Sequence, residues 1–248
     1  MDKKAIISLI LVIVVISAAL VYYESNRIRQ ESMAHSYRYT VQIESTGPVH
    51  NPVIIVPIGS VNGPSLIVDA IESGQMTGVP DDWNLTVIPT LDGIFLKISA
   101  PRIIASTPVT PLAADEESDQ TEVPVNRPTP VVLGVRVDSE SAVETISPEG
   151  TEPVLGPRTK TTQVPCTFPH PDNMPVTCYT YTVPVYADFG ASNHTRLSIQ
   201  IEMEGENTWW LGGWSGNSYH DRVHFTVIGP FSGWTTGEGT SVYGLGRY

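Results

Sequence analysis

The stretch YRYTVQIE, residues 37–44, alternates apolar and polar side chains at every position. A period of two places the apolar side chains on one face of an extended chain and the polar ones on the other. This pattern predicts a β-strand with one buried face. Residues 196–203, RLSIQIEM, repeat it with leucine, isoleucine and methionine on the apolar face. The chain therefore contains at least two half-buried strands that are far apart in sequence.

Further strands are expected where short apolar or alternating runs are bounded by turn residues. VIIVPI, residues 53–58, is a continuous apolar run and predicts a strand buried on both faces, with Pro57 at its end or at a bulge. One segment favours a helix instead: residues 65–73 place their apolar side chains on one helical face, and Gly74 suits a C-terminal cap. The remaining predicted strands are residues 84–89, 93–99, 131–137, 159–168, 176–189 and 219–228.

The composition also favours a mainly β fold, because 21 prolines and 20 glycines break helices and punctuate strands. Short strands separated by turns are typical of a β-sandwich, and we expect one here, with an immunoglobulin-like form as one version. The predicted boundaries are a first β region at 37–110, an acidic proline-rich loop or linker at 111–130, and a second β region at 131–248. Whether these regions form one domain or two stays open.

The N-terminus predicts a transmembrane anchor. Residues 5–23, AIISLILVIVVISAALVYY, carry no charge and end in a tyrosine pair suited to a membrane interface. At about 1.5 Å per residue, a helix of this length spans about 28 Å, close to the hydrocarbon thickness of a bilayer. Residues 1–4 would be a cytoplasmic tail, and residues 24–36 would extend the helix as a polar stalk.

Two alternatives to a retained anchor remain open. Ser17-Ala18-Ala19 offers a cleavage point for a signal peptide. Lys4-Ala5-Ile6 loosely resembles the processing site of archaeal type IV pilin precursors, which implies a pilin-like or filament-associated subunit. The numbers of basic residues on the two sides of the apolar segment are nearly equal and do not decide its orientation. We place the N-terminus inside because so short a tail has nothing to fold. The C-terminal domain is then expected to be extracytoplasmic and attached to the cell membrane.

Cys166 and Cys178 are the only cysteines, and they flank a turn between two predicted strands. We expect a disulfide between them in an oxidising compartment, the alternative being two free buried thiols. Asn84 and Asn193 begin N-x-T sequons, which matter only for an extracytoplasmic domain in a host that glycosylates. Both predictions are consistent with a domain outside the cytoplasm.

The most distinctive segment is WWLGGWSGNSY, residues 209–219. Flat rings beside flexible glycines could stack on sugars or anchor a protein partner. The competing interpretation is that some of these rings fill one end of the core, because tryptophan is usually largely buried. The candidate ligand-binding aromatics are Trp209, Trp210, Trp214, Tyr219 and Trp234.

Two groups of residues that contain histidine have spacings that suggest catalytic or metal-binding sites, but their contexts argue against both. His220, Arg222 and His224 would share one face of a strand, where residues four apart are about 13 Å apart, too far for one ion. His170 and Asp172 lie in a proline-rich turn without a nucleophile motif. We therefore assign no catalytic, cofactor-binding or metal-ligating residue.

The net charge of the protein limits the classes of molecule that it can bind. A formal charge of −12 repels nucleic-acid phosphates and argues against a nucleic-acid partner. The sequence predicts a membrane-anchored, extracytoplasmic β-sandwich protein with a binding or structural role in the cell envelope, and an envelope protein or glycan as partner. A membrane-tethered hydrolase with a dispersed site is the alternative, and no cofactor is expected.

Overall fold

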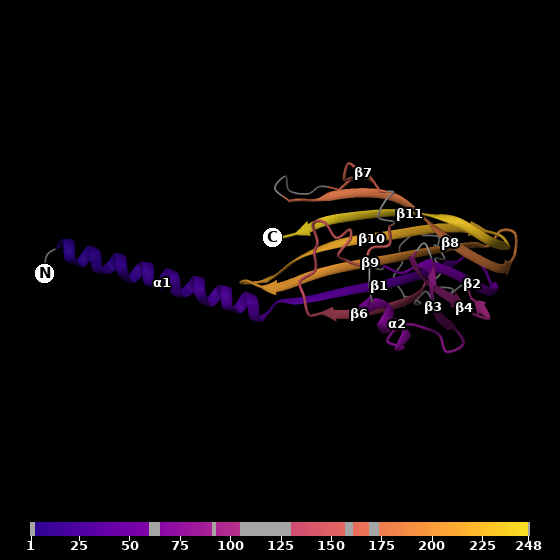
Figure 1. The fold of residues 1–248 in the computed structure, drawn as a ribbon, viewed down its shortest axis with the longest axis horizontal. Coiled ribbons are helices and arrows are strands. Elements are labelled where there is room, and N and C mark those ends of the chain that lie inside the picture. The colour runs from indigo at the N-terminus through magenta and orange to yellow at the C-terminus, as the bar shows by residue number, and fades with distance from the viewer. Residues whose placement is uncertain are drawn as a thin grey trace, which may run out of the picture.

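The computed structural model describes residues 3–59, 65–90, 93–104, 130–156, 161–168 and 174–247, with side-chain surroundings given from Ile10 onward. A long N-terminal helix projects from one end of a β domain (Figure 1). The predicted acidic loop at 111–130 falls almost wholly outside the described residues, as do His170 and Asp172. The helices are α1 (Lys3–Glu31) and α2 (Leu66–Glu72). The strands are β1 (Ala34–Ser45), β2 (Val49–Pro57), β3 (Asn84–Thr90), β4 (Gly93–Ser99), β5 (Arg102–Ile103), β6 (Val131–Ser139), β7 (Thr162–Val164), β8 (Thr177–Ala191), β9 (Arg196–Trp210), β10 (Trp214–Ile228) and β11 (Phe231–Gly246).

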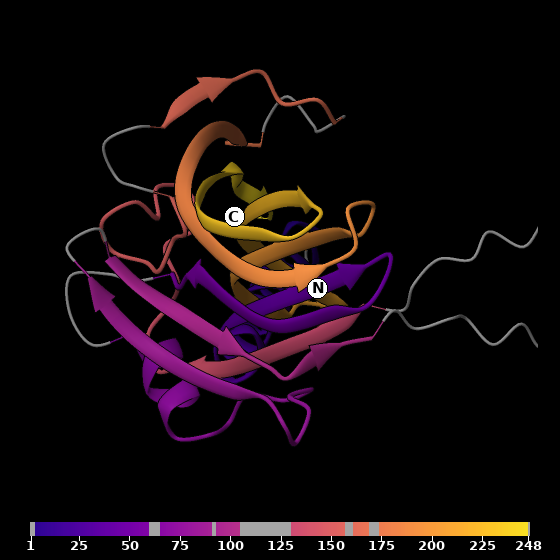
Figure 2. The same ribbon diagram turned by 90° about the vertical axis from the view of Figure 1, so that its right-hand side faces the viewer.

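The strands form one antiparallel sheet whose main order is β3-β4-β2-β8-β11-β10-β9-β1-β6, with β5 beside β2 and β7 beside β8. Seen along its length, the sheet curls around a central core (Figure 2). The fold is therefore mainly β, as the sequence predicts, but the immunoglobulin-like sandwich is not confirmed, because the described strands belong to one curled sheet. Long strands twist, and a sheet of many long twisted strands curls instead of lying flat.

The predicted alternations hold in the strands that line the core. Tyr39, Val41 and Ile43 of β1 are buried, as are the apolar residues of β9 from Leu197 to Met203. In β2, Ile54 and Val56 are buried while Val53 and Ile55 are half-buried, so this strand alternates where burial of both faces was expected. Pro57 closes β2, where its missing N–H interrupts no ladder.

Strands from both predicted β regions interleave in this sheet. β1 lies between β6 and β9, and β2 lies between β4 and β8. The predicted short helix is α2, which begins after Ser65 and buries Ile67, Ala70 and Ile71. Gly74, at a φ of +77°, follows its C-terminal cap. α2 packs against β6, β3 and β1, where it covers the open side of the curl.

Helix α1 ends earlier than the predicted stalk. It stops at Glu31, and residues 34–36 already belong to β1, where they pair with residues 206–208 of β9. Pairing with β9 outweighs the helix propensity of this segment. From Ile10 to Glu31 the helix is long and apolar enough to cross a membrane by length and composition, a criterion that a signal sequence also meets.

Candidate functional site

The β9–β10 hairpin ends in a tight apolar tip at the end of the domain that carries α1 (Figure 1). Trp210 pairs with Trp214 across the hairpin, and the three residues between them make the turn. Gly212 has a φ of +67°, a conformation that glycine adopts without strain. The N–H of Leu211 donates a 2.9 Å hydrogen bond to the carbonyl oxygen of Gly213 and closes the turn.

Three large apolar side chains at this tip are exposed. The exposed fractions are 39% for Trp210, 48% for Leu211 and 71% for Trp214. The two indoles contact each other edge to face, with ring centroids 5.8 Å apart. We call Trp210, Leu211 and Trp214 the aromatic tip.

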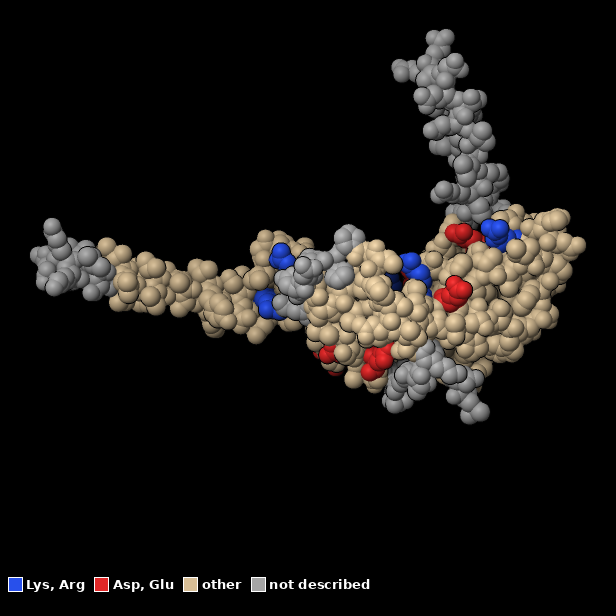
Figure 3. All heavy atoms as spheres, turned by 90° about the horizontal axis from the view of Figure 1, so that it is seen from above, with Lys and Arg blue, Asp and Glu red and all other residues tan. Residues whose placement is uncertain are grey.

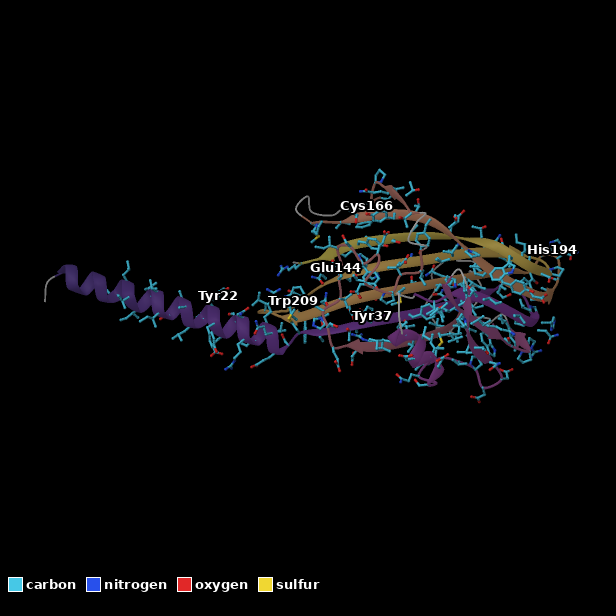
Figure 4. All side chains as sticks on the ribbon, viewed as in Figure 1. Tyr22, Tyr37, Glu144, Cys166, His194 and Trp209 are labelled. Carbon is cyan, nitrogen blue, oxygen red and sulfur yellow. A yellow bond between two sulfur atoms is a disulfide. The ribbon has the colours of Figure 1, made fainter. Side chains whose placement is uncertain are left out.

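The β9–β10 hairpin is connected to the end of α1 by two contacts. The backbone N–H of Trp210 donates a 2.8 Å hydrogen bond to Oγ of Ser32, just after the helix. The Arg29 guanidinium lies 4.9 Å from the ring centroid of Trp209, a cation–π contact. Trp209 itself is buried, at 4% exposure. The hairpin and the end of the helix therefore lie side by side, and Figure 4 shows Trp209 next to the end of α1.

A shallow open pocket of about 460 Å³ adjoins the aromatic tip. Its lining comprises Met174, the hairpin residues 211–216, Gly246 and Arg247. The end of β11 closes one side, because the N–H of Arg247 donates a 3.0 Å hydrogen bond to the carbonyl oxygen of Gly216. Among the described residues that line this pocket, Arg247 is the charged one and none is a carboxylate.

The other candidate aromatics lie elsewhere. Tyr219 is fully buried, and its hydroxyl donates a 2.6 Å hydrogen bond to the carbonyl oxygen of Pro153. Trp234 is 57% exposed and contacts Tyr186 and Phe95. It lies on β11 near the opposite end of the sheet, close to the turn that contains His194 (Figure 4). The structure thus separates the five candidates into an exposed tip, two buried rings and one distant exposed ring.

Sequence reasoning missed a buried polar network inside the curl. The segment from 141 to 156, which we call the strap, crosses the concave side of the sheet and is held by side chains of β1, β9 and β10. Asn207 accepts a hydrogen bond from the N–H of Val143 and donates one to its carbonyl oxygen, at 2.8 and 2.9 Å. Glu152 of the strap accepts a hydrogen bond from the Tyr37 hydroxyl. The strap is therefore a packed part of the core.

Asp221 is the centre of this network. Both of its carboxylate oxygens are occupied: Oδ1 accepts from the hydroxyls of Tyr181 and Ser241, and Oδ2 accepts from the N–H groups of Leu155 and Gly156. Burial raises the pKa of Asp221, and these hydrogen bonds lower it in part. Burial and the charge of Asp221 raise the pKa of Tyr181.

The same argument applies to Glu152, whose two oxygens accept from Tyr37 and from the N–H of Glu144. Burial and Glu152 raise the pKa of Tyr37. These carboxylates hold the strap, and neither presents a free oxygen to a substrate. The sequence contains one signal for Asp221. By the alternation of β10 it lies on the same face as Val223, Phe225 and Val227, so an acidic residue occupies a position of the apolar face.

The predicted histidine row lies on the outer face of β10. His220, Arg222 and His224 are exposed, as their spacing predicts. His220 faces Glu204 at 3.3 Å, and Arg222 pairs with Glu202 at 2.7 Å. No group of three or more metal-ligating side chains occurs among the described residues.

The structure contains the disulfide between Cys166 and Cys178, which fastens the chain beyond β7 to β8. Asn84 and Asn193 are both exposed, at the start of β3 and in the turn between β8 and β9. The two cysteines and the two asparagines are relevant to the cellular compartment of the domain, and they do not indicate a reaction. No family model, no curated protein and no solved structure matches this chain.

Proposed function

We propose that this protein is a membrane-anchored extracytoplasmic protein whose β domain has a binding or structural role in the cell envelope. The observation that carries the proposal is the exposure of α1. Its apolar side chains from Ile10 to Tyr23 are not buried by the described part of the domain, and the large ones are 51–75% exposed. A continuous apolar surface of this size is unfavourable in water and favourable in lipid, where a helix also satisfies its own backbone groups.

The other end of α1 supports an anchor that holds the domain close to the membrane. Its polar residues are fixed to β9 through Arg29 and Ser32, and β1 begins at Ala34. The disulfide and the two exposed sequon asparagines are consistent with an oxidising compartment. The hydrolase alternative gains no support from Asp221 and Glu152, because their oxygens already bind the strap.

The anchor is tested with the full-length chain in membranes, by alkaline carbonate extraction and mass spectrometry of the N-terminal peptide. We expect the protein to stay in the membrane fraction with residues 5–23 intact. An N-terminus after Ala19 would show a cleaved signal peptide, and an N-terminus at Ile6 would show pilin-type processing. Either result would refute a simple retained anchor.

A charge variant gives the matched control. Arginine at the centre of a transmembrane helix costs about 2.5–3.5 kcal/mol on insertion scales, so Val14→Arg with Val15→Arg should release the protein from membranes. Ser25→Arg adds a charge outside the predicted span and should not. Equal extraction of both variants would contradict the proposal. Protection of the Cys166–Cys178 disulfide from an impermeant reductant in sealed cells would contradict the extracytoplasmic orientation.

A further inference from the structure

We infer that the aromatic tip is a second membrane contact, at which Trp210, Leu211 and Trp214 enter the interface of the bilayer that α1 spans. This inference rests on the proposed anchor and adds a surface of the β domain to it. The partner is a phospholipid surface. The tip would fix the tilt of the domain and would direct its opposite end, with Asn193 and Trp234, away from the membrane.

Position is the first support. Strand β9 runs toward α1 and ends at Trp210, whose N–H is bonded to Ser32, so the turn beyond Trp210 projects alongside the last turns of the helix (Figure 1). Nine residues separate Tyr23 from Ser32, or about 13 Å of helix. Headgroups occupy about 5–8 Å of that distance, and transmembrane helices tilt by about 20° on average. A tilt toward the hairpin therefore brings the tip to the headgroups.

Chemistry is the second support. Indole rings concentrate at membrane interfaces because they combine a large apolar face with one N–H donor. Trp210 and Trp214 contact each other and leave 39% and 71% of their surfaces free, while Leu211 is 48% exposed. The nearby Trp209 is buried instead against Arg29, so the exposed rings of this hairpin are those of Trp210 and Trp214.

Charge is the third support. The protein carries a formal charge of −12, yet residues 207–219 contain no acid. Arg247 borders the adjoining pocket and could donate hydrogen bonds to a lipid phosphate. The acids of the nearby helix, Glu24 and Glu31, both lie beside Arg27, at 3.2 and 3.6 Å. Figure 3 shows basic side chains where the helix meets the domain, so positive charge is present at the end that would face the membrane.

The test uses the full-length protein in phosphatidylcholine vesicles, with and without lipids brominated on the acyl chains near the headgroup. Bromine quenches tryptophan fluorescence on contact. We expect bromolipid to quench the wild type and this quenching to disappear in the Trp210→Phe, Trp214→Phe double variant. Phenylalanine keeps the tip apolar, and circular dichroism checks the fold. Trp234→Phe, which removes an exposed ring at the opposite end, should leave the quenching intact.

Flotation of the same vesicles separates this inference from the anchor. If the protein floats but bromolipid does not quench it, or if the double variant is quenched like the wild type, the membrane contact is refuted and the anchor stands. If the protein fails to float, both are refuted. If acrylamide in the water quenches the two tip rings equally with and without vesicles, the tip faces solvent and is open to a protein or sugar partner, which also overturns the inference.

Discussion

The middle of strand β10 and its start behave in opposite ways. Its inward side chains, Tyr219 and Asp221, are buried and hydrogen-bonded to the strap. At its start, Trp214 is 71% exposed, more than any other large apolar side chain in the described part of the β domain, and its ring contacts that of Trp210. A group with all its partners inside the fold contributes to stability, while a large apolar group without partners is available to something outside. We therefore expect the interior residues to stabilise the fold and the aromatic tip to bind a partner.

Replacement of Asp221 should have the largest effect. Asp221→Ala leaves two backbone N–H groups and two hydroxyls without their buried acceptor, and we expect a loss of about 3–5 kcal/mol in the free energy of unfolding. Urea denaturation of the full-length protein in detergent measures this loss. The control is Asp188→Ala, on β8, where the acid is only half-buried. Equal midpoints for the two variants would break the assignment of stability to the strap network.

The raised pKa of Asp221 predicts a pH dependence with a defined sign. The folded state holds the proton of the Asp221 carboxyl more tightly than the unfolded chain does. Protonation of Asp221 therefore stabilises the fold fully below the ordinary pKa of 3.8, and this stabilisation is lost as the pH rises through the pKa of the folded state. Asp221→Asn does not titrate. We therefore expect the stability of the wild type relative to Asp221→Asn to fall as the pH rises above 4. A difference that stays constant or increases would show that the pKa is not raised.

Two glycines differ in the same way between the interior of the sheet and the hairpin turn. A Cβ on Gly239 would overlap the ring of Tyr181 inside the sheet, whereas one on Gly213 would have no neighbour within 4 Å. We expect Gly239→Ala to cost about 1–3 kcal/mol through forced repacking and Gly213→Ala to have no measurable effect. Thermal denaturation of both variants tests this. A similar loss at Gly213 would mean that the tip is packed against part of the protein.

Replacement of the two tip tryptophans is expected to have only a small effect on stability. Trp210→Ser with Trp214→Ser removes an edge-to-face pair, which contributes about 0.5–1.5 kcal/mol, and exposes no buried group. We expect less than about 1.5 kcal/mol in urea denaturation but clear loss of the bromolipid contact. Trp209→Ser, next to the tip but buried against Arg29, should instead destabilise the protein by more than 2 kcal/mol, as core truncations do. The reverse order would refute the division between tip and core.

The sequence predicted the features that depend on local pattern. The apolar helix, the alternation in β1 and β9, the short helix α2 and the disulfide all follow from spacing and composition. β11 was missed because its sequence, FSGWTTGEGTSVYGLG, has few apolar residues at alternate positions. The ring of Tyr181 on β8 occupies the space beside Gly239, a cross-strand pairing that no local pattern reveals.

The curl of the sheet and the strap depend on contacts between distant segments. Leu155 and Asp221 are 66 positions apart, and Val143 and Asn207 are 64 apart, so neither pair is visible in a local window. The tip was found as a tryptophan-rich segment, but the division between Trp209, inside, and Trp214, outside, follows from the pairing of the hairpin with α1 and β1. Only Asp221 had a local signal, an acid in phase with the apolar row of β10.

We expect the sheet to present the aromatic tip to the membrane that α1 enters. The most direct measurement is ¹⁹F NMR of the full-length protein in lipid bicelles, with its five tryptophans fluorinated and each resonance assigned by a Trp→Phe variant. We predict that a nitroxide near the lipid headgroups broadens the resonances of Trp210 and Trp214, while a water-soluble paramagnetic chelate broadens that of Trp234. Trp214 broadened by the aqueous chelate and unaffected by the lipid nitroxide would contradict the account.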